Sequence, residues 1–112
     1  MDKLQQYRQI ICQVLTEQAH PYSHSNDVET EIICDTEHDH YQLAYVGWEN
    51  QQRIFNLILH FDIKNGKIWI QHNGTEIDFA EELVISGVPK QDIVIGFHTP
   101  FMRKMTEYAV GL

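Results

Sequence analysis

The sequence is short of lysine and arginine. Eight basic residues stand against sixteen acidic ones, so the formal net charge is −8. No basic residue lies between Gln9 and Gln52, a stretch that holds eight of the acids and therefore the whole excess of negative charge. Proteins that bind duplex DNA directly neutralise its phosphates with lysine and arginine. We therefore expect no direct nucleic-acid binding, and a basic protein partner suits the negative field better.

A long apolar run is also missing. Without one, the chain has no segment that could span a bilayer. Tyr7, Arg8 and Gln9 interrupt the apolar residues near the N-terminus, so we expect no signal peptide and a cytoplasmic location. The two cysteines, Cys12 and Cys34, show no CxxC or zinc-ligand spacing and are predicted to be buried free thiols.

Familiar catalytic motifs are absent as well. The sequence contains no GxSxG, P-loop, GxGxxG or HExxH pattern. We therefore predict no catalytic residues, no cofactor and no metal site. With 112 residues and a hydrophobic fraction of 43%, the chain suits one globular domain over residues 1–112.

What the sequence contains is a helical pattern followed by strand patterns. Residues 3–19 carry apolar side chains at helical spacing, with Asp2 as the predicted N-cap. Residues 28–35, 41–48, 53–63 and 67–72 are predicted strands, and Asn65-Gly66 is a strong signal for a type I′ turn. We predict an α+β fold with an N-terminal helix, a four-stranded antiparallel meander, a following helix and an irregular C-terminal segment.

The later elements depend on capping residues. Thr75 is the predicted N-cap of a helix over residues 76–86, and Gly87 is its C′ residue. Residues 93–95 are predicted as a short buried strand or extended piece. Thr99 and Pro100 form an N-cap and N1 pair that starts a short helix.

Alternation along the third and fourth strands predicts which side chains form the core. A two-residue turn at Asn65-Gly66 gives one face the residues Phe55, Leu57, Leu59, Phe61, Ile63, Ile68 and Ile70. The other face carries Ile58, His60, Asp62, Trp69 and Gln71. The second strand adds Tyr41, Leu43 and Tyr45 to this other face if Asn50-Gln51 is the turn, and a one-residue slip exchanges the two sets.

The second face is the main functional feature, because tyrosine and tryptophan on an open sheet are typical of protein–protein surfaces. The predicted interaction surface is Tyr41, Leu43, Tyr45, Ile58, His60, Trp69 and Gln71. The alternative is that the chain's own helices cover both faces of the sheet.

Histidine and aspartate residues suggest an enzymatic alternative. His60 and Asp62 project the same way along one strand, near Tyr41, and His38 and His40 lie among carboxylates in a predicted turn. Either group could serve a small metal- or His/Asp-dependent hydrolase or nuclease. We do not favour this alternative, because a flat sheet offers no cleft and no three histidines converge in the expected register.

Several segments together resemble the XisI family, the cyanobacterial controlling factors for excision of the fdxN element. They are residues 35–43, 46–48, 60–76, 87–94 and 96–98, which read DTEHDHYQL, VGW, HFDIKNGKIWIQHNGTE, GVPKQDIV and GFH. The resemblance runs from Tyr7 to Val110.

The resemblance implies a role in programmed DNA excision during heterocyst development, a form of site-specific recombination. It implies partners, namely a XisH-type accessory protein and a recombinase. It transfers no catalytic residue. Taken with the sheet face, it predicts an accessory or regulatory protein that acts by protein–protein contact and forms a homodimer.

Overall fold

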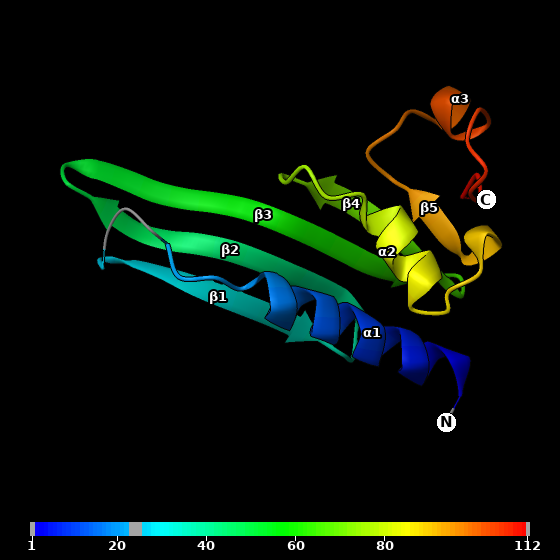
Figure 1. Cartoon of the computed structure of the whole chain (residues 1–112), viewed down its shortest axis with the longest axis horizontal. Coiled ribbons are helices and arrows are strands. Elements are labelled where there is room, and N and C mark those ends of the chain that lie inside the picture. Colours follow the sequence, from blue (N-terminus) through cyan, green and yellow to red (C-terminus); the bar gives the residue numbers. More distant parts are fainter. Residues whose placement is uncertain (1, 23–25, 112) are drawn as a thin grey trace.

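The computed structural model describes residues 2–22 and 26–111. The chain forms one sheet with helices packed on it, and its extents are 44 × 34 × 24 Å (Figure 1). The elements are α1 (Lys3–Gln18), β1 (Val28–Asp35), β2 (His40–Glu49), β3 (Gln52–Lys64), β4 (Lys67–Asn73), α2 (Phe79–Ile85), the 3-10 helix η1 (Lys90–Asp92), β5 (Ile93–Ile95) and α3 (Pro100–Arg103).

The sheet confirms the predicted α+β class and adds one strand to it. Its order is β1-β2-β3-β4-β5, with antiparallel pairing from β1 to β4. The short strand β5 then pairs with β4 in parallel, so the sheet is mixed rather than purely antiparallel. The prediction of four strands missed this pairing because a run of three apolar residues fits a buried loop equally well.

Turns and caps agree with the sequence at several points. Asn65 and Gly66 both have positive φ, as a type I′ turn requires. The Asp2 carboxylate accepts a hydrogen bond from the Gln5 N–H and caps α1. The Thr99 hydroxyl accepts from the Met102 N–H and caps α3.

The start of α2 differs from the prediction. The N-cap is Asp78, whose side chain accepts from the Glu81 N–H, so the helix begins at Phe79 rather than at residue 76. Thr75 is held elsewhere, since both its backbone N–H and its hydroxyl donate to the Asn73 side chain. The loop before α2 is therefore longer than predicted.

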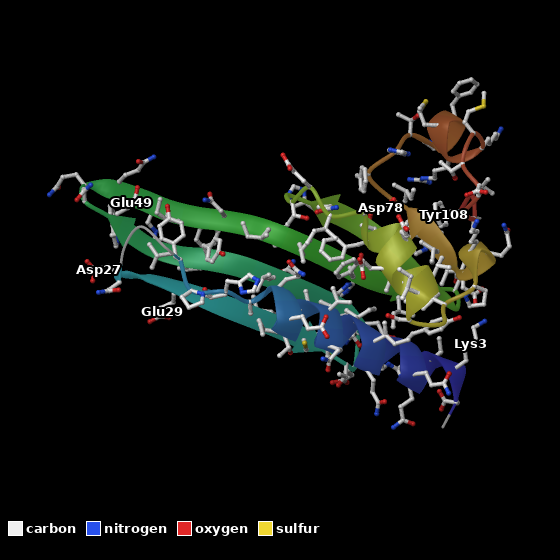
Figure 2. The ribbon with its side chains drawn as sticks, in the orientation of Figure 1. Lys3, Asp27, Glu29, Glu49, Asp78 and Tyr108 are labelled. Carbon is white, nitrogen blue, oxygen red and sulfur yellow. The ribbon has the colours of Figure 1, made fainter. Side chains whose placement is uncertain are left out.

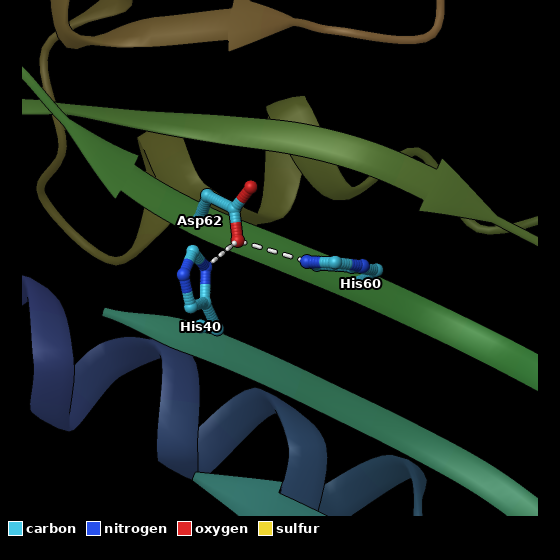
Figure 3. Close-up of side chains that lie close together, drawn as sticks. All are labelled: His40, His60 and Asp62. Atoms are coloured by element: carbon cyan, nitrogen blue, oxygen red, sulfur yellow. Dashed lines mark hydrogen bonds and ion pairs between the residues drawn. The ribbon is translucent and has the colours of Figure 1, made fainter. Parts of the chain in front are cut away.

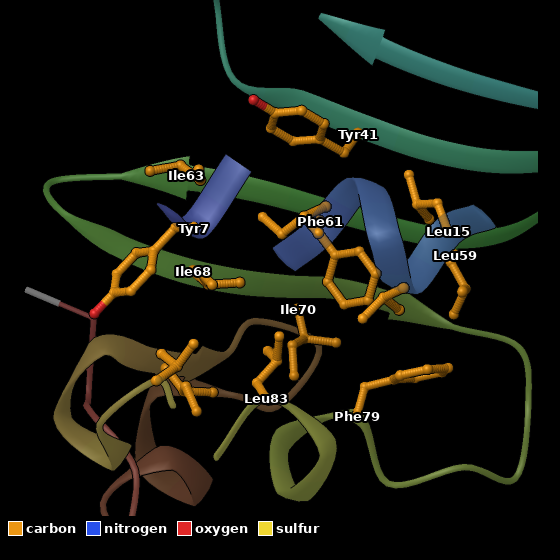
Figure 4. Packing of buried hydrophobic residues seen from close by; sticks show 14 of the residues in the cluster. Tyr7, Leu15, Tyr41, Leu59, Phe61, Ile63, Ile68, Ile70, Phe79 and Leu83 are labelled. Atoms are coloured by element: carbon orange, nitrogen blue, oxygen red, sulfur yellow. The ribbon is translucent and has the colours of Figure 1, made fainter. Parts of the chain in front are cut away.

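Both main helices cover the same face of the sheet, which we call the inner face. Tyr7 and Leu15 of α1 and Leu83 of α2 pack there against Phe61 of β3 and Ile70 of β4 (Figure 4). The Phe61 and Phe79 rings meet edge to face at 5.9 Å between centroids. This cluster is the main hydrophobic core.

A β-bulge in β3 changes the face on which its odd-numbered side chains lie. Leu43 pairs with Leu59 and Ala44 pairs with Leu57, which leaves Ile58 without a partner on β2. The extra residue reverses the alternation beyond it. Phe55 and Leu57 therefore lie on the outer face, away from the helices, and their predicted place in the core is wrong: the Phe55 side chain is 73% exposed and that of Phe61 is fully buried.

The C-terminal segment covers part of the outer face. Trp69 of β4, Val94 of β5 and Ala109 form a second buried cluster there, and Val94 pairs with Ala109 in an isolated parallel bridge. The Arg103 and Lys64 side chains lie over the Trp69 ring. The outer face is thus closed at the β4–β5 end and open along β1–β3.

Two further features complete the fold. Cys12 of α1 and Cys34 of β1 are free, and the prediction that both are buried is wrong, because Cys34 is exposed and Cys12 is half-buried.

In the described part of the chain, every helix is too short or too polar to cross a membrane.

Candidate functional site

A cluster of two histidines and one aspartate lies on the outer face. His40 Nδ1 and His60 Nε2 are each 2.8 Å from the same oxygen, Oδ1 of Asp62 (Figure 3). His40 lies directly opposite Asp62 across β2 and β3, and His60 lies two residues before Asp62 on β3. The bulge at Ile58 sets this register, because without it His40 would lie opposite Phe61.

Two glutamines surround the cluster. Gln71 Nε2 donates to Oδ2 of Asp62 at 3.1 Å, and the Gln42 carboxamide lies 3.2 Å from Nδ1 of His60. Gln71 reaches Asp62 because it is itself the extra residue of a second bulge, between β3 and β4. Both carboxylate oxygens of Asp62 are therefore occupied.

The cluster favours the ionised form of Asp62. Burial alone would raise the pKa of this carboxyl, whose residue is 8% exposed, but hydrogen bonds from His40, His60 and Gln71 together lower it below its usual value. The hydrogen bond to Asp62 raises the pKa of His40, with the charges of Asp35 and Asp39 adding to the effect. The outer face thus holds a negative charge surrounded by hydrogen-bond donors.

Tyr41 does not take part, contrary to the predicted grouping with His60 and Asp62. Its side chain lies on the inner face, where its hydroxyl donates to Asp39 at 2.8 Å. Asp39 also accepts two hydrogen bonds from the guanidinium of Arg8 in α1. Of the two histidines predicted to lie among carboxylates in the turn, His38 contacts Asp35 and stays outside the cluster that His40 joins.

An exposed apolar surface lies beside the cluster on the same face. Successive cross-strand pairs place its members together: Ala44 lies opposite Leu57, and Val46 lies opposite Phe55. A shallow hollow runs between these strands. We call this surface the outer patch, and its residues are Ile33, Ala44, Val46, Trp48, Phe55 and Leu57.

Comparison with known proteins identifies the family. The profile described as "XisI protein" matches residues 1–110. The chain belongs to the XisI family. No curated protein matches it.

Two crystal structures of XisI-family proteins from Anabaena variabilis ATCC 29413 are similar to this chain. A XisI-like protein is 44% identical, with a TM-score of 0.89, over 96% of this chain and 98% of that one. The fdxN element excision controlling factor XisI is 33% identical, with a TM-score of 0.83, over 97% of this chain and 99% of that one. The fold described above is therefore the XisI fold.

Within this XisI fold, most residues of the predicted interaction surface do not lie on the open part of the outer face. Tyr41 and Leu43 are fully buried in the core, and their predicted place on the open face is wrong. The bulge explains the error, because it reverses the relation between β2 and the second half of β3. Trp69 is on the outer face as predicted but is 7% exposed beneath the C-terminal segment.

The other four predicted residues divide between the two faces. Tyr45 lies on the side of α1, where its ring meets that of Tyr22 edge to face. Ile58 packs against the core at the bulge. His60 and Gln71 belong to the histidine–aspartate cluster. The sequence did not predict the outer patch, because predicting it requires knowing where the bulge lies.

The acidic excess of the sequence is divided between two places, because Asp35, Glu37 and Asp39 lie at the turn between β1 and β2 and a second group lies at the opposite end of these strands. Asp27, Glu29 and Glu49 lie together at the end of the long strands β1–β3 (Figure 2). Several of the basic side chains are engaged within the chain, since Lys3 pairs with Asp92 and Arg8 pairs with Asp39. This XisI-family surface is thus apolar in one area and negative beside it.

Proposed function

We propose that this chain is an accessory factor for the programmed excision of a DNA element, and that it acts by binding other proteins through the outer patch. The family supports the first part, because a relative with the same fold carries the name of fdxN element excision controlling factor. The observation that carries the second part is the outer patch, with Phe55 and Trp48 both more than half exposed.

The outer patch has the properties of a protein-binding surface. It is contiguous across three strands, contains two large aromatic side chains and is bordered by polar and acidic residues. Burying one large apolar side chain is worth about 1.5–3 kcal/mol, so the exposed side chains of the patch would contribute several kcal/mol against the cost of association. The Arg53 guanidinium lies over both the Trp48 and Phe55 rings and would hold them in place.

The charge distribution favours protein over DNA as the partner. The end of the sheet that carries the patch also carries Asp27, Glu29 and Glu49, which repel phosphates and attract basic proteins. The proposed partners are a second copy of this chain, a XisH-type accessory protein and a recombinase. The proposed location is the cytoplasm, and the proposal includes no catalytic step by this chain.

The test compares two exposed phenylalanines. Phe55→Glu places a charge within the outer patch, whereas Phe101→Glu places one on α3, where the side chain is 65% exposed. We expect Phe55→Glu to weaken self-association, or binding to a purified XisH-type protein or recombinase, at least tenfold, the factor that about 1.4 kcal/mol produces. Phe101→Glu should bind like the unmodified chain.

Sedimentation velocity and pull-down with the purified partners provide the measurements, and circular dichroism checks that both variants are folded. A folded Phe55→Glu variant that keeps every measured association would contradict the proposed contact surface. It would leave the family assignment unchanged.

A further inference from the structure

We propose that His40, His60 and Asp62 form a binding site for a divalent transition-metal ion, with Zn²⁺ as the ion that the donor atoms favour. Among the described residues, these three each offer one ligand atom, and the atoms all lie within 4.8 Å of one another. The inference is independent of the protein-contact function proposed above, because it rests on a different set of residues.

The donor atoms select the class of ion. Two imidazole nitrogens and one carboxylate oxygen are typical ligands of zinc and its transition-metal neighbours. Calcium and magnesium prefer shells made of oxygen atoms, which this cluster does not supply. With two neutral histidines and one ionised aspartate, the site has a charge of −1, and Asp35 lies opposite His40 on β1 to add to the negative field.

The geometry requires a small adjustment. In a tetrahedral zinc site with bonds of roughly 2.1 Å, neighbouring ligand atoms are about 3.4 Å apart. The two nitrogen atoms here are 2.8 Å from Asp62 Oδ1, so each contact must lengthen by about half an ångström. The His40 side chain is 56% exposed, and its ring can move outward to make this space.

The surrounding residues match the support that metal sites use. Gln71 holds Oδ2 of Asp62 and leaves Oδ1 directed at the two histidines. Nδ1 of His60 lies 3.2 Å from the Gln42 carboxamide. The Gln42 atom nearest Nδ1 is the amide nitrogen Nε2, which donates to Nδ1 in the metal-free arrangement. With the metal on Nε2 of His60, Nδ1 carries the proton, so the Gln42 carboxamide must turn over to present its oxygen as the acceptor.

The number of ligands leaves one coordination position open. Three protein ligands from two adjacent strands occupy one side of the ion, and the exposed His40 lies at the solvent edge. A fourth position occupied by water is the arrangement of zinc sites that remain accessible. This position faces the same side of the sheet as the outer patch.

The test is zinc titration of the full chain after treatment with a chelator. We expect one Zn²⁺ per chain by calorimetry, and Co²⁺ in its place should give the intense visible absorption bands of a tetrahedral site. His40→Ala should weaken Zn²⁺ binding at least tenfold while leaving the fold intact, because its side chain is largely exposed. Asp62→Asn should weaken it at least as much, with circular dichroism to confirm folding.

His38→Ala is the matched control, because His38 is also exposed and contacts an aspartate but lies outside the cluster. It should bind Zn²⁺ like the unmodified chain. The proposal is overturned if the unmodified chain binds no Zn²⁺, if His40→Ala binds it with unchanged affinity, or if His38→Ala loses as much affinity as His40→Ala.

Discussion

At the scale of single residues, Asp92 joins the N-terminal helix to the end of the sheet. The Tyr7 hydroxyl donates to Oδ2 of Asp92, and Lys3 Nζ lies 2.9 Å from the same oxygen. Burial would raise the pKa of Asp92, but the hydrogen bonds from Tyr7 and Lys3 and the charge of Lys3 outweigh it and lower the pKa below its usual value. A carboxyl whose pKa is lowered by folding stabilises the folded state only while it is ionised.

The pH dependence of stability should follow from that contact. Asp92→Asn should lower the free energy of unfolding by about 1 kcal/mol at neutral pH, since Lys3 and Tyr7 lose a charged acceptor. The difference from the unmodified chain should remain constant from neutral pH down to about 5 and shrink as the pH falls below about 4, where the carboxyl of Asp92 takes up a proton in the unfolded chain before it does so in the folded one. Urea titrations at a series of pH values measure it, and a difference that does not change with pH would contradict the assignment.

The two cysteines give a second prediction at this scale. Cys12 Sγ and Cys34 Sγ lie 3.3 Å apart, between α1 and β1. Treatment with diamide, which accepts two electrons and two protons, should convert the two thiols into one intramolecular disulfide. Partial burial and the contact with Cys12 raise the pKa of Cys34 to about 11, so the reaction should accelerate as the pH rises.

Mass spectrometry of the oxidised chain should show the loss of two hydrogen atoms and one linked pair of peptides. The loop closed by the new bond should raise the free energy of unfolding by about 3 kcal/mol. Cys12→Ser is the control and should form no intramolecular bond. Disulfide-linked dimers of the unmodified chain, in place of the intramolecular bond, would contradict the prediction.

At the scale of elements, β3 shows what the sequence could and could not predict. Its extent, its turn with β4 and the core residues Leu59, Phe61 and Ile63 were predicted correctly. The bulge was not, because Ile58 is an ordinary strand residue and a bulge depends on how two backbones pair. For the same reason the sequence could not reveal that His40 lies opposite Asp62.

The start of α2 illustrates a different limit. Thr75 and Asp78 are both good N-cap residues, and Asp78 lies three positions after Thr75. The structure uses Asp78 because the Asn73 side chain accepts both the N–H and the hydroxyl of Thr75. A competing local hydrogen bond decided the boundary, and the residue types alone do not rank the two.

Two phenylalanines on β3 test the reversal directly. Strict alternation places Phe55 and Phe61 on the same face, whereas the bulge separates them. Phe61→Ala should lower the free energy of unfolding by about 3–5 kcal/mol, because it leaves a cavity in the core. Phe55→Ala should change it by no more than about 0.5 kcal/mol, because the side chain is exposed.

Chemical denaturation of the two variants, followed by tryptophan fluorescence, provides the comparison. Equal losses of stability in both variants would contradict the placement of the bulge. If the outer patch forms a dimer, the stability of the unmodified chain depends on protein concentration. The stability difference caused by Phe55→Ala would then also depend on concentration, whereas the difference caused by Phe61→Ala would not.

At the scale of the whole molecule, charge and shape divide the chain into two ends. One end carries the helices of the core and the C-terminal segment, and the other carries the outer patch together with Asp27, Glu29 and Glu49 (Figure 2). The sequence alone located the acidic stretch and predicted no DNA-binding surface there. It could not locate the outer patch, which combines residues from three strands.

The shortage of basic residues gives the last prediction. The purified chain alone should not retard a short DNA duplex in a mobility-shift assay, even at low salt, because its basic residues are few and several are paired within the chain. If the proposed contacts with a recombinase exist, a shift should appear only when that protein is added. Retardation by the chain alone, with a steep dependence on salt, would contradict the prediction.

The unpaired Ile58 also has an evolutionary consequence. Before this residue the odd-numbered side chains of β3 lie on the outer face, where a partner can bind, and after it they lie in the chain's own core. Substitutions at positions 53, 55 and 57 can therefore follow changes in a partner without disturbing positions 59, 61 and 63. Aligned XisI-family sequences should accordingly show two rates of change along this strand, with the break at the inserted residue.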